Sequence, residues 1–357
     1  CLLPRGLGDV YKRQKKICMK KRLVMIAGVC VCTLIAAAGL YQNYSKNEKY
    51  QKQLFAMDTY MEFTAYGRGG QQAVEKAAKE VQRLDALLSA QNEESQVYAL
   101  NQRGSLEVSD DLAEIIQRGK EIFQETDGLF DDTIYPLMEL WGFPTGEYHV
   151  PSGEEIENLL PDVDGGTVEI SGNTVTLGEG QQIDLGGIAK GYTGEKLTEI
   201  FQGYGVSSAM VSLGGNIQAI GTKPDGSSWR VGIRDPKGSQ QDYAGVLQVQ
   251  NEAVVTSGGY ERYFEEDGRT YIHIIDPRTG YPVENDLLSV TIVSPDGTLA
   301  DGLSTALYIM GYDKAVQFWE QHQDEFDVIL ITADEQIHVS KKLQDSFQSD
   351  KNWETIE

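Results

Sequence analysis

Apolar and polar positions recur with two different periods along this chain. Between Met57 and Gly67 the alternation has a period of two, which is typical of a strand with one buried face. From Gln71 to Leu88, and again from Leu112 to Phe123, apolar residues return every three or four positions. That spacing predicts two amphipathic helices, and Thr126-Asp127-Gly128 ends the second one.

The remaining pattern mixes short strands with helices. Residues 165–184 contain short strand patterns separated by turns, and the C-terminal half combines strands with two helices, one after Lys190 and one from Gly302 onward. No internal repeat occurs, and strands and helices do not alternate steadily. We therefore expect an α+β fold with mixed, largely antiparallel sheets and flanking helices, built as one compact unit.

An uncharged run from Leu23 to Tyr41 follows the basic residues 20–22. At about 1.5 Å per residue this run spans roughly 28 Å as a helix, close to the hydrocarbon thickness of a bilayer. The basic flank places the N-terminus in the cytoplasm and the rest of the chain outside. A cleaved signal peptide ending near Ala36-Ala37-Ala38 is the alternative, and lipoprotein processing at Cys30 or Cys32 is a third; all three export the domain.

These features predict four segments. Residues 1–18 are interpreted as an upstream or non-native leader, 19–41 as a signal or membrane anchor, 42–53 as a tether and 54–345 as the catalytic domain. We expect a protein of the bacterial cell membrane with an extracytoplasmic catalytic domain. All four cysteines precede residue 33, so the domain contains no disulfide, thiolate metal site or cysteine nucleophile.

The chain is strongly acidic, with a net charge of −23. Residues 1–22 hold eight of the 31 basic residues but one of the 54 acidic ones, so 23 basic and 53 acidic residues remain, a net charge of −30. Such a surface excludes nucleic acid as a partner. A domain of this charge needs a cation to bind a pyrophosphate, which points to a divalent metal.

The segment Ile183-Asp184-Leu185-Gly186-Gly187-Ile188-Ala189-Lys190-Gly191-Tyr192 reads as a short strand, a glycine turn and the start of a helix. Glycines before a helix allow a ligand to approach the backbone, and the free N–H groups of a helix start favour anions. Lys190 in the first turn is unfavourable to the helix dipole unless an anion offsets it. By itself this signal is weak, because many glycine turns only connect a strand to a helix.

Four further segments follow in order along the chain: Val211–Ile217 with Gly214-Gly215, Val255–Phe264 with Ser257-Gly258-Gly259, His273–Gly280 with Asp276-Pro277, and Ala300–Ala306 with Asp301-Gly302. With the glycine turn, this series closely resembles the ApbE family of FAD:protein FMN transferases, formerly described as thiamine-biosynthesis lipoproteins. The resemblance runs from about Met57 into the 330s and implies the ApbE-like α+β fold.

Asp301 and Thr305 are four residues apart, so on a helix they share one face. A carboxylate and a hydroxyl suit a hard cation such as magnesium, although Asp301 could instead cap the helix. The family resemblance implies that Asp301 and Thr305 hold Mg²⁺ together with the carbonyl of Ala189, with Ser304 beside them. No His/Cys cluster points to zinc.

Other site residues are also implied by the resemblance. His273 lines the flavin site, and either His273 or Asp301 takes the proton of the acceptor hydroxyl; we expect Tyr271, His273 and Ile275 on one face of a strand that ends at Asp276. Asn216, Ser257 and Arg262 are expected in the pocket. The flavin contacts that the resemblance implies are Met57, Leu129, Phe130, Asp131, Asp184, Lys190 and Ile275.

The implied activity is transfer of the FMN moiety of FAD to a threonine or serine of a partner protein, with release of AMP. The expected acceptors are FMN-binding subunits of membrane redox complexes. Hydrolysis of FAD to FMN and AMP by the same residues is one alternative. Binding of flavin by an exported protein without chemistry is another.

Overall fold

The computed structural model describes residues 7–239 and 241–357, in two units, Cys1–Glu48 and Lys49–Glu357. The first unit contains helix α1 (Leu7–Asn47). The first six residues of the expected leader 1–18 lie outside the described residues. The side chains at 34–45, which include the second half of the expected apolar run, also lie outside them. Among the residues that are described, no helix is long and apolar enough to cross a membrane. The membrane-anchor prediction is therefore not confirmed.

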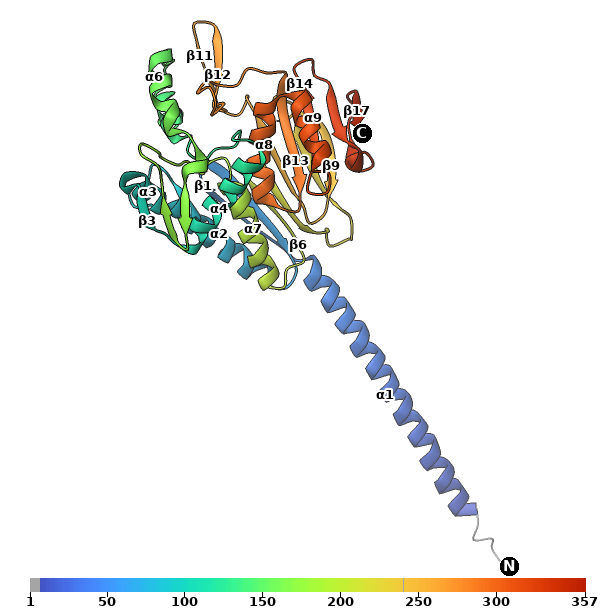
Figure 1. Ribbon diagram of the computed structural model, residues 1–357. Helices are drawn as coiled ribbons and strands as arrows, with labels where there is room; N and C mark the ends of the chain where they lie inside the picture. The colour runs from blue at the N-terminus through green and yellow to red at the C-terminus, as the bar shows by residue number, and fades with distance from the viewer. Residues whose placement is uncertain (1–6, 240) are drawn as a thin grey trace, which may run out of the picture. The chain divides into compact units, whose positions relative to one another are not determined.

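A nine-stranded sheet lies at the centre of the second unit (Figure 1). Neighbouring strands are antiparallel throughout, except that β15 and β17 are parallel. In sheet order the strands are β1 (Lys49–Ala56), β2 (Thr59–Tyr66), β6 (Ser208–Leu213), β7 (Asn216–Gly221), β10 (Ala253–Gly258), β13 (Leu287–Ser294), β14 (Asp327–Thr332), β15 (Ile337–Ser340) and β17 (Trp353–Ile356). The predicted α+β class with largely antiparallel sheets is confirmed.

Helices cover one face of this sheet. They are α2 (Gly70–Leu88), α4 (Asp110–Glu125), α7 (Ala189–Gly203), α8 (Gly297–Met310) and α9 (Tyr312–Gln321). The apolar stripe predicted for α2 is buried at Val74, Ala77, Val81, Leu84 and Leu88. Burying a valine or leucine side chain contributes about 1.5–3 kcal/mol, so this stripe fixes the helix on the sheet.

A small sheet covers the other face, with strand order β16 (Phe347–Gln348), β9 (Tyr243–Val249) and β8 (Trp229–Arg234). Successive residues of the central strands therefore face two different cores. In β13, Ile292 packs among the helices, whereas Val293 packs against the small sheet. A strand buried on both faces reads as a continuous apolar run, as β14 does from Val328 to Ile331.

The shorter elements lie beside these layers. They are α3 (Gln96–Arg103), β3 (Ser105–Glu107), α5 (Tyr135–Leu140), α6 (Gly153–Leu159), β4 (Glu169–Ser171), β5 (Thr174–Thr176), β11 (Tyr263–Glu266) and β12 (Arg269–Ile272). Three one-turn 3₁₀ segments are η1 (Leu160–Asp162), η2 (Gly165–Thr167) and η3 (Lys341–Leu343). The hairpin of β11 and β12 stands apart from the central sheet (Figure 1).

The second unit extends beyond the expected catalytic domain, 54–345, at both ends. Residues 49–53 of the expected tether belong to β1, which pairs with β2 along its whole length. The polar composition of β1 concealed it, because one of its faces is exposed. At the other end, β16 and β17 extend the folded unit past residue 345 to Ile356.

Candidate functional site

Helices α7 and α8 carry the three predicted metal ligands, Ala189, Asp301 and Thr305, and they touch at Gly191. A β-carbon at Gly191 would lie 2.1 Å from the carbonyl oxygen of Gly297 and 2.7 Å from the β-carbon of Asp301. Only glycine permits this approach of the two helices. Gly302 similarly makes room for Ile122 of α4, since a β-carbon there would lie 2.7 Å from that side chain. These glycines bring the first turn of α7 against Asp301.

Asp301 is 5 % exposed, and both of its carboxylate oxygens accept hydrogen bonds. The Gly191 N–H donates to Oδ2 at 2.7 Å and the Asn216 amide donates to Oδ1 at 2.9 Å. Burial raises the pKa of Asp301, and the charge of Lys190 opposes that rise. The N–H of Gly191, in the first turn of α7, thus binds a carboxylate. Asp301 does not cap α8, because the cap is Asp296 and the helix begins five residues before Gly302.

A cluster of hydroxyl groups lies next to Asp301. Thr305 follows one turn later in α8, as the spacing predicts, and Ser257 of β10 faces it with 3.4 Å between the two hydroxyl oxygens. Ser304 donates to the Asp301 carbonyl at 2.8 Å, and its oxygen lies 2.7 Å from that of Ser257. Ser257 therefore links both hydroxyls of α8 to the sheet.

The expected metal ligands supply oxygen atoms of three kinds: the Asp301 carboxylate, the Thr305 hydroxyl and the Ala189 carbonyl. That carbonyl accepts a hydrogen bond from Thr193 at 2.7 Å and belongs to the first turn of α7, two residues before Gly191. Among the described residues, no group of three or more His, Cys, Asp or Glu side chains could hold a metal ion. The expected ligand set is of a different kind, because it contains only one carboxylate, that of Asp301. A buried carboxylate with hydroxyl and carbonyl oxygens suits a hard cation such as Mg²⁺.

Lys190 is the common neighbour of the other charged groups. Its ammonium donates to the Gly186 carbonyl at 3.3 Å, and its charge lowers the pKa values of Asp184, Asp301 and His273 against the effect of burial on the two aspartates. The Lys190 side chain therefore folds back over the glycine turn. These four residues, predicted from three separate segments, lie close enough to interact electrostatically.

Asp184 is partly buried at the end of the segment that precedes the glycine turn. Burial raises the pKa of Asp184, and its Oδ1 accepts a hydrogen bond from Gly186 N at 2.7 Å. Asn101 of α3 binds the preceding residue twice, donating to the Ile183 carbonyl at 2.9 Å and accepting from its N–H at 2.8 Å. Asn101 was missed in the sequence because nothing local links α3 to residue 183.

His273 does not lie within a strand, contrary to the prediction, because β12 ends at Ile272. Its Nδ1 lies 3.1 Å from the carbonyl oxygen of Arg262, an arrangement in which Nδ1–H donates and leaves the lone pair of Nε2 free. Burial, together with the charges of Arg262 and Lys190, lowers the pKa of His273 to about 4. The imidazole is therefore neutral at physiological pH, as a proton acceptor must be.

Met57 and Asp58 form the two-residue turn between β1 and β2, with φ values of 48° and 56°. A type I′ turn needs positive φ at both positions, which is unfavourable for methionine. Asp85 of α2 accepts the Met57 N–H at 2.9 Å, and the Met57 sulfur lies 3.9 Å from the Thr193 hydroxyl in α7. The predicted flavin-contact residue is thus held beside the α7 turn. Asp85, which we did not predict, holds it there.

The other predicted flavin contacts are buried. Phe130 packs between the two glycine segments, since β-carbons at Gly187 and Gly302 would lie 3.1 Å and 3.6 Å from its ring. The Asp131 carboxylate binds Thr133 and the Gly165 N–H, so it fixes its own turn. Leu129 and Ile275 lie in hydrophobic cores. Their flavin contacts stay predictions.

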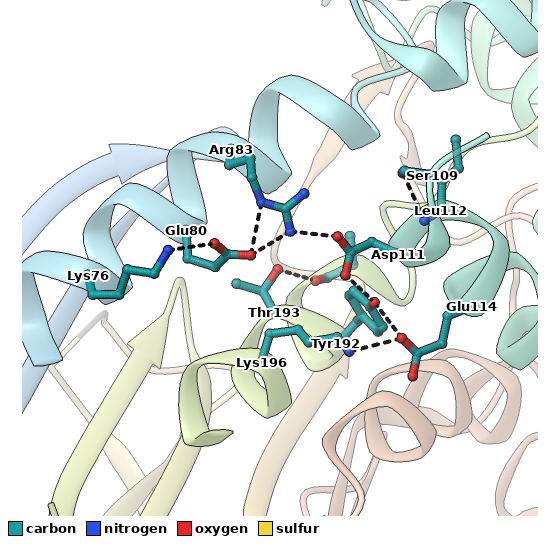
Figure 2. Close-up of polar contacts among 11 residues, drawn as sticks. Lys76, Glu80, Arg83, Ser109, Asp111, Leu112, Glu114, Tyr192, Thr193 and Lys196 are labelled. Carbon is teal, nitrogen blue, oxygen red and sulfur yellow. Dashed lines mark hydrogen bonds and ion pairs between the residues drawn. The ribbon is translucent and has the colours of Figure 1, made fainter. Parts of the chain in front are cut away.

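A polar network links α7 to α4 and α2 (Figure 2). The Tyr192 hydroxyl lies 2.9 Å from Asp111 and 2.8 Å from Glu114, both in α4, and Lys196 pairs with Glu114 at 2.9 Å. Arg83 of α2 joins the network through Asp111 at 2.7 Å. Helices α2 and α4 are thereby tied to α7, whose first turn contains Ala189 and Lys190.

The sequence of this chain matches a known family. The ApbE family profile covers residues 57–330, and the chain belongs to the ApbE family. A similar protein is the FAD:protein FMN transferase of Treponema pallidum, 33 % identical over 341 residues, which cover 89 % of this chain and 94 % of that protein. The FAD:protein FMN transferase of Escherichia coli K12 is 32 % identical over 68 % of this chain and 72 % of its own length.

Solved structures agree. The ApbE protein of Thermotoga maritima is similar with a TM-score of 0.79 and 32 % identity, over 85 % of this chain and 100 % of that one. The flavinyl transferase ApbE of Pseudomonas stutzeri gives a TM-score of 0.72 and 30 % identity, over 80 % and 92 % of the two chains. The enzyme class is therefore FAD:protein FMN transferase, with FAD as the flavin substrate.

Proposed function

We propose that this enzyme is magnesium-dependent, binds FAD at the α7–α8 contact and transfers the FMN moiety to a threonine or serine hydroxyl, releasing AMP. The observation that carries the proposal is the convergence of Asp301, Thr305, Ala189 and Lys190. One carboxylate, one hydroxyl, one carbonyl and one ammonium provide a cation site next to a positive charge. That combination suits a diphosphate.

Charge decides how the diphosphate binds. The chain carries a net charge of −23, so an unassisted dianion would be repelled. Lys190 provides one positive charge, and Asp301, Thr305 and Ala189 would hold the Mg²⁺. The ion, when bound, supplies charge stabilisation for the phosphate oxygens and for the departing AMP.

The transfer requires one bond to form and one to break. The acceptor oxygen bonds to the phosphorus on the FMN side, the bond from that phosphorus to the bridging oxygen breaks, and AMP leaves with that oxygen. The acceptor proton passes to Nε2 of His273. Asp301 is the less suitable base, because both of its oxygens already accept N–H groups.

The N-terminal residues and the enzyme class support a proposed location and proposed partners. The basic residues 20–22 and the apolar run after them support an extracytoplasmic, membrane-anchored enzyme. The acceptors in that location are FMN-binding subunits of membrane redox complexes, such as sodium-pumping quinone reductases.

The test is incubation of the purified enzyme with FAD, MgCl₂ and an acceptor subunit, followed by denaturing electrophoresis and detection of covalent flavin. We expect covalent flavin and an equal amount of AMP. In Asp301→Asn and Thr305→Ala we expect losses on the order of 10³-fold, since the interaction lost amounts to several kcal/mol. Asp313→Asn, an exposed carboxylate in α9, is the matched control.

Other outcomes have definite meanings. Free FMN and AMP without covalent flavin would establish hydrolysis instead of transfer. Full activity in both variants, or in EDTA, would remove the proposed metal site.

A further inference from the structure

Ser257 connects the central sheet to the hydroxyl groups of α8. Side chains of a strand alternate between its two faces, and Val255 of β10 packs among the helices. Ser257 lies two residues later, on the same face. Its oxygen lies 2.7 Å from that of Ser304 and 3.4 Å from that of Thr305. The end of β10 therefore lies directly against the turn of α8 that contains the predicted ligand Thr305.

Gly259 allows this close approach of strand and helix. A β-carbon at Gly259 would lie 3.0 Å from the hydroxyl oxygen of Tyr308, one turn of α8 beyond Ser304. A residue with a side chain would push the chain after β10 away from α8. The glycine thus keeps Ser257 level with Ser304 and Thr305.

Each hydroxyl group has a single proton, and this fixes the direction of the hydrogen bonds in the cluster. Ser304 donates its proton to the Asp301 carbonyl at 2.8 Å, because a carbonyl can only accept. Ser304 can then only accept from Ser257, so Ser257 donates to it. Ser257 has no second proton, and the bond between Ser257 and Thr305 is therefore donated by Thr305. The protons all point one way, from Thr305 through Ser257 and Ser304 to the Asp301 carbonyl.

This direction leaves both lone pairs of the Thr305 oxygen available to another partner. With the reverse direction, Ser257 would occupy one of them. Ser304 is fully buried, whereas Thr305 is only partly buried, so the cluster is open at Thr305. Oxygen lone pairs are what a hard cation such as Mg²⁺ requires of a ligand.

We propose that Ser257 is a positioning residue for Thr305: it accepts the Thr305 proton and so turns the lone pairs of Thr305 toward the cation site. The proposal rests on the proposed function, in which Thr305 is a ligand of Mg²⁺. Ser257 acts only through Thr305 and takes no part in the bond changes of the transfer.

The test is metal binding by the full-length enzyme without acceptor, with and without FAD. The probe is Mn²⁺, which takes the same oxygen ligands as Mg²⁺ and is counted as the free ion by electron paramagnetic resonance. In Ser257→Ala we expect the Kd for Mn²⁺ to rise about tenfold or more, because removing a group that hydrogen-bonds a metal ligand typically costs about 10- to 100-fold in affinity. Ser257→Thr keeps the hydroxyl and should bind Mn²⁺ like wild type.

Thr256→Val is the matched control. Thr256 is the preceding residue of β10, and its hydroxyl oxygen lies 2.8 Å from that of Thr291 in β13, on the face turned away from α8. The substitution removes a hydroxyl of the same kind from the same strand, and we expect no change in Mn²⁺ binding. In the transfer reaction, Ser257→Ala should raise the KM for Mg²⁺ by the same factor as the Kd, with kcat at saturating Mg²⁺ and the KM for FAD unchanged.

Several results would overturn the proposal. Wild-type Mn²⁺ affinity in Ser257→Ala shows that Thr305 needs no positioning. An equal loss in Ser257→Thr shows that the hydroxyl is not the reason, and an equal loss in Thr256→Val shows a general effect on the sheet. Should Ser257→Ala not fold, Ser257→Cys, with a weak thiol acceptor, takes its place and should also bind Mn²⁺ less tightly. By contrast, wild type that binds no Mn²⁺, or that transfers FMN in EDTA, refutes the metal site of the proposed function itself.

Discussion

His273 lies where burial and two positive charges act in the same direction. All three disfavour the imidazolium, so the pKa falls to about 4 and the ring is neutral over the whole physiological range. A base of such low pKa accepts a proton only weakly in the free enzyme. In the proposed complex, a diphosphate beside Lys190 would add negative charge near His273. We therefore expect the pKa of His273 to rise when the substrate binds, which would make it a stronger base.

The pH dependence of kcat/KM tests this account, because kcat/KM reports the free enzyme. Below the pKa His273 is protonated and cannot accept a proton, so activity falls as the pH drops through about 4. In Arg262→Gln one positive neighbour is removed, and we expect this acid limb to move toward the ordinary histidine pKa of about 6.5. NMR titration of His273 should show the same shift. Arg278→Gln, which removes an arginine paired with Asp276, is the control, and an unmoved limb in Arg262→Gln contradicts the account.

At the scale of elements, the β1–β2 turn keeps two non-glycine residues at positive φ. Such positions cost on the order of 1–3 kcal/mol each in unfavourable cases, and they persist only where the surroundings hold them. Asp85 stabilises the turn by accepting a hydrogen bond from the Met57 N–H. We expect Asp85→Ala to raise the KM for FAD about tenfold with a smaller change in kcat, because a misplaced Met57 weakens flavin binding. Asp85→Asn retains the acceptor oxygen and should behave like wild type; equal KM values in all three proteins would show that the turn needs no support.

A pair of carboxyl groups, those of Glu195 and Asp296, also lies where α7 meets α8. Glu195 of α7 accepts the Thr298 N–H at 2.9 Å, and Asp296, the cap of α8, pairs with Arg118 of α4. Burial and the hydrogen bond with Asp296 raise the pKa of Glu195 to about 7. A raised folded-state pKa contributes stability that is complete below the ordinary value of about 4.5 and is lost as the pH rises through about 7.

We therefore expect the Tm of wild type to fall between pH 6 and 8 by a few degrees, which corresponds to about 1 kcal/mol for a domain of this size. Glu195→Gln keeps a hydrogen-bonding side chain without a proton to lose, so its Tm should change less over the same range. Calorimetry at constant ionic strength measures both. A wild-type Tm that stays constant or rises over this range contradicts the raised pKa of Glu195.

At the scale of the molecule, the sequence predicted what periodicity and short motifs encode. The stripe of α2, the spacing of Asp301 and Thr305 and the ApbE fold were all correct. Contacts between distant segments were not predictable: Asn101 binds residue 183 and Asp85 binds residue 57, and neither pair has a local signal. β1 was missed for a related reason, because an edge strand with an exposed polar face does not show an apolar alternation.

The same strand provides a test of where the domain begins. The family resemblance starts at Met57, but β1 lies before it, and Leu54 and Ala56 pack in the core under α2. A chain starting at Lys49 keeps all eight pairings with β2, and we expect its Tm and FAD affinity to equal those of the full chain. A chain starting at Met57 loses those pairings and the turn that holds Met57, and it exposes the edge of β2, a loss of several kcal/mol. Thermal melts of both fragments by circular dichroism measure the difference. If the shorter fragment melts as the longer one does, β1 is an appendage and the domain begins where the resemblance does.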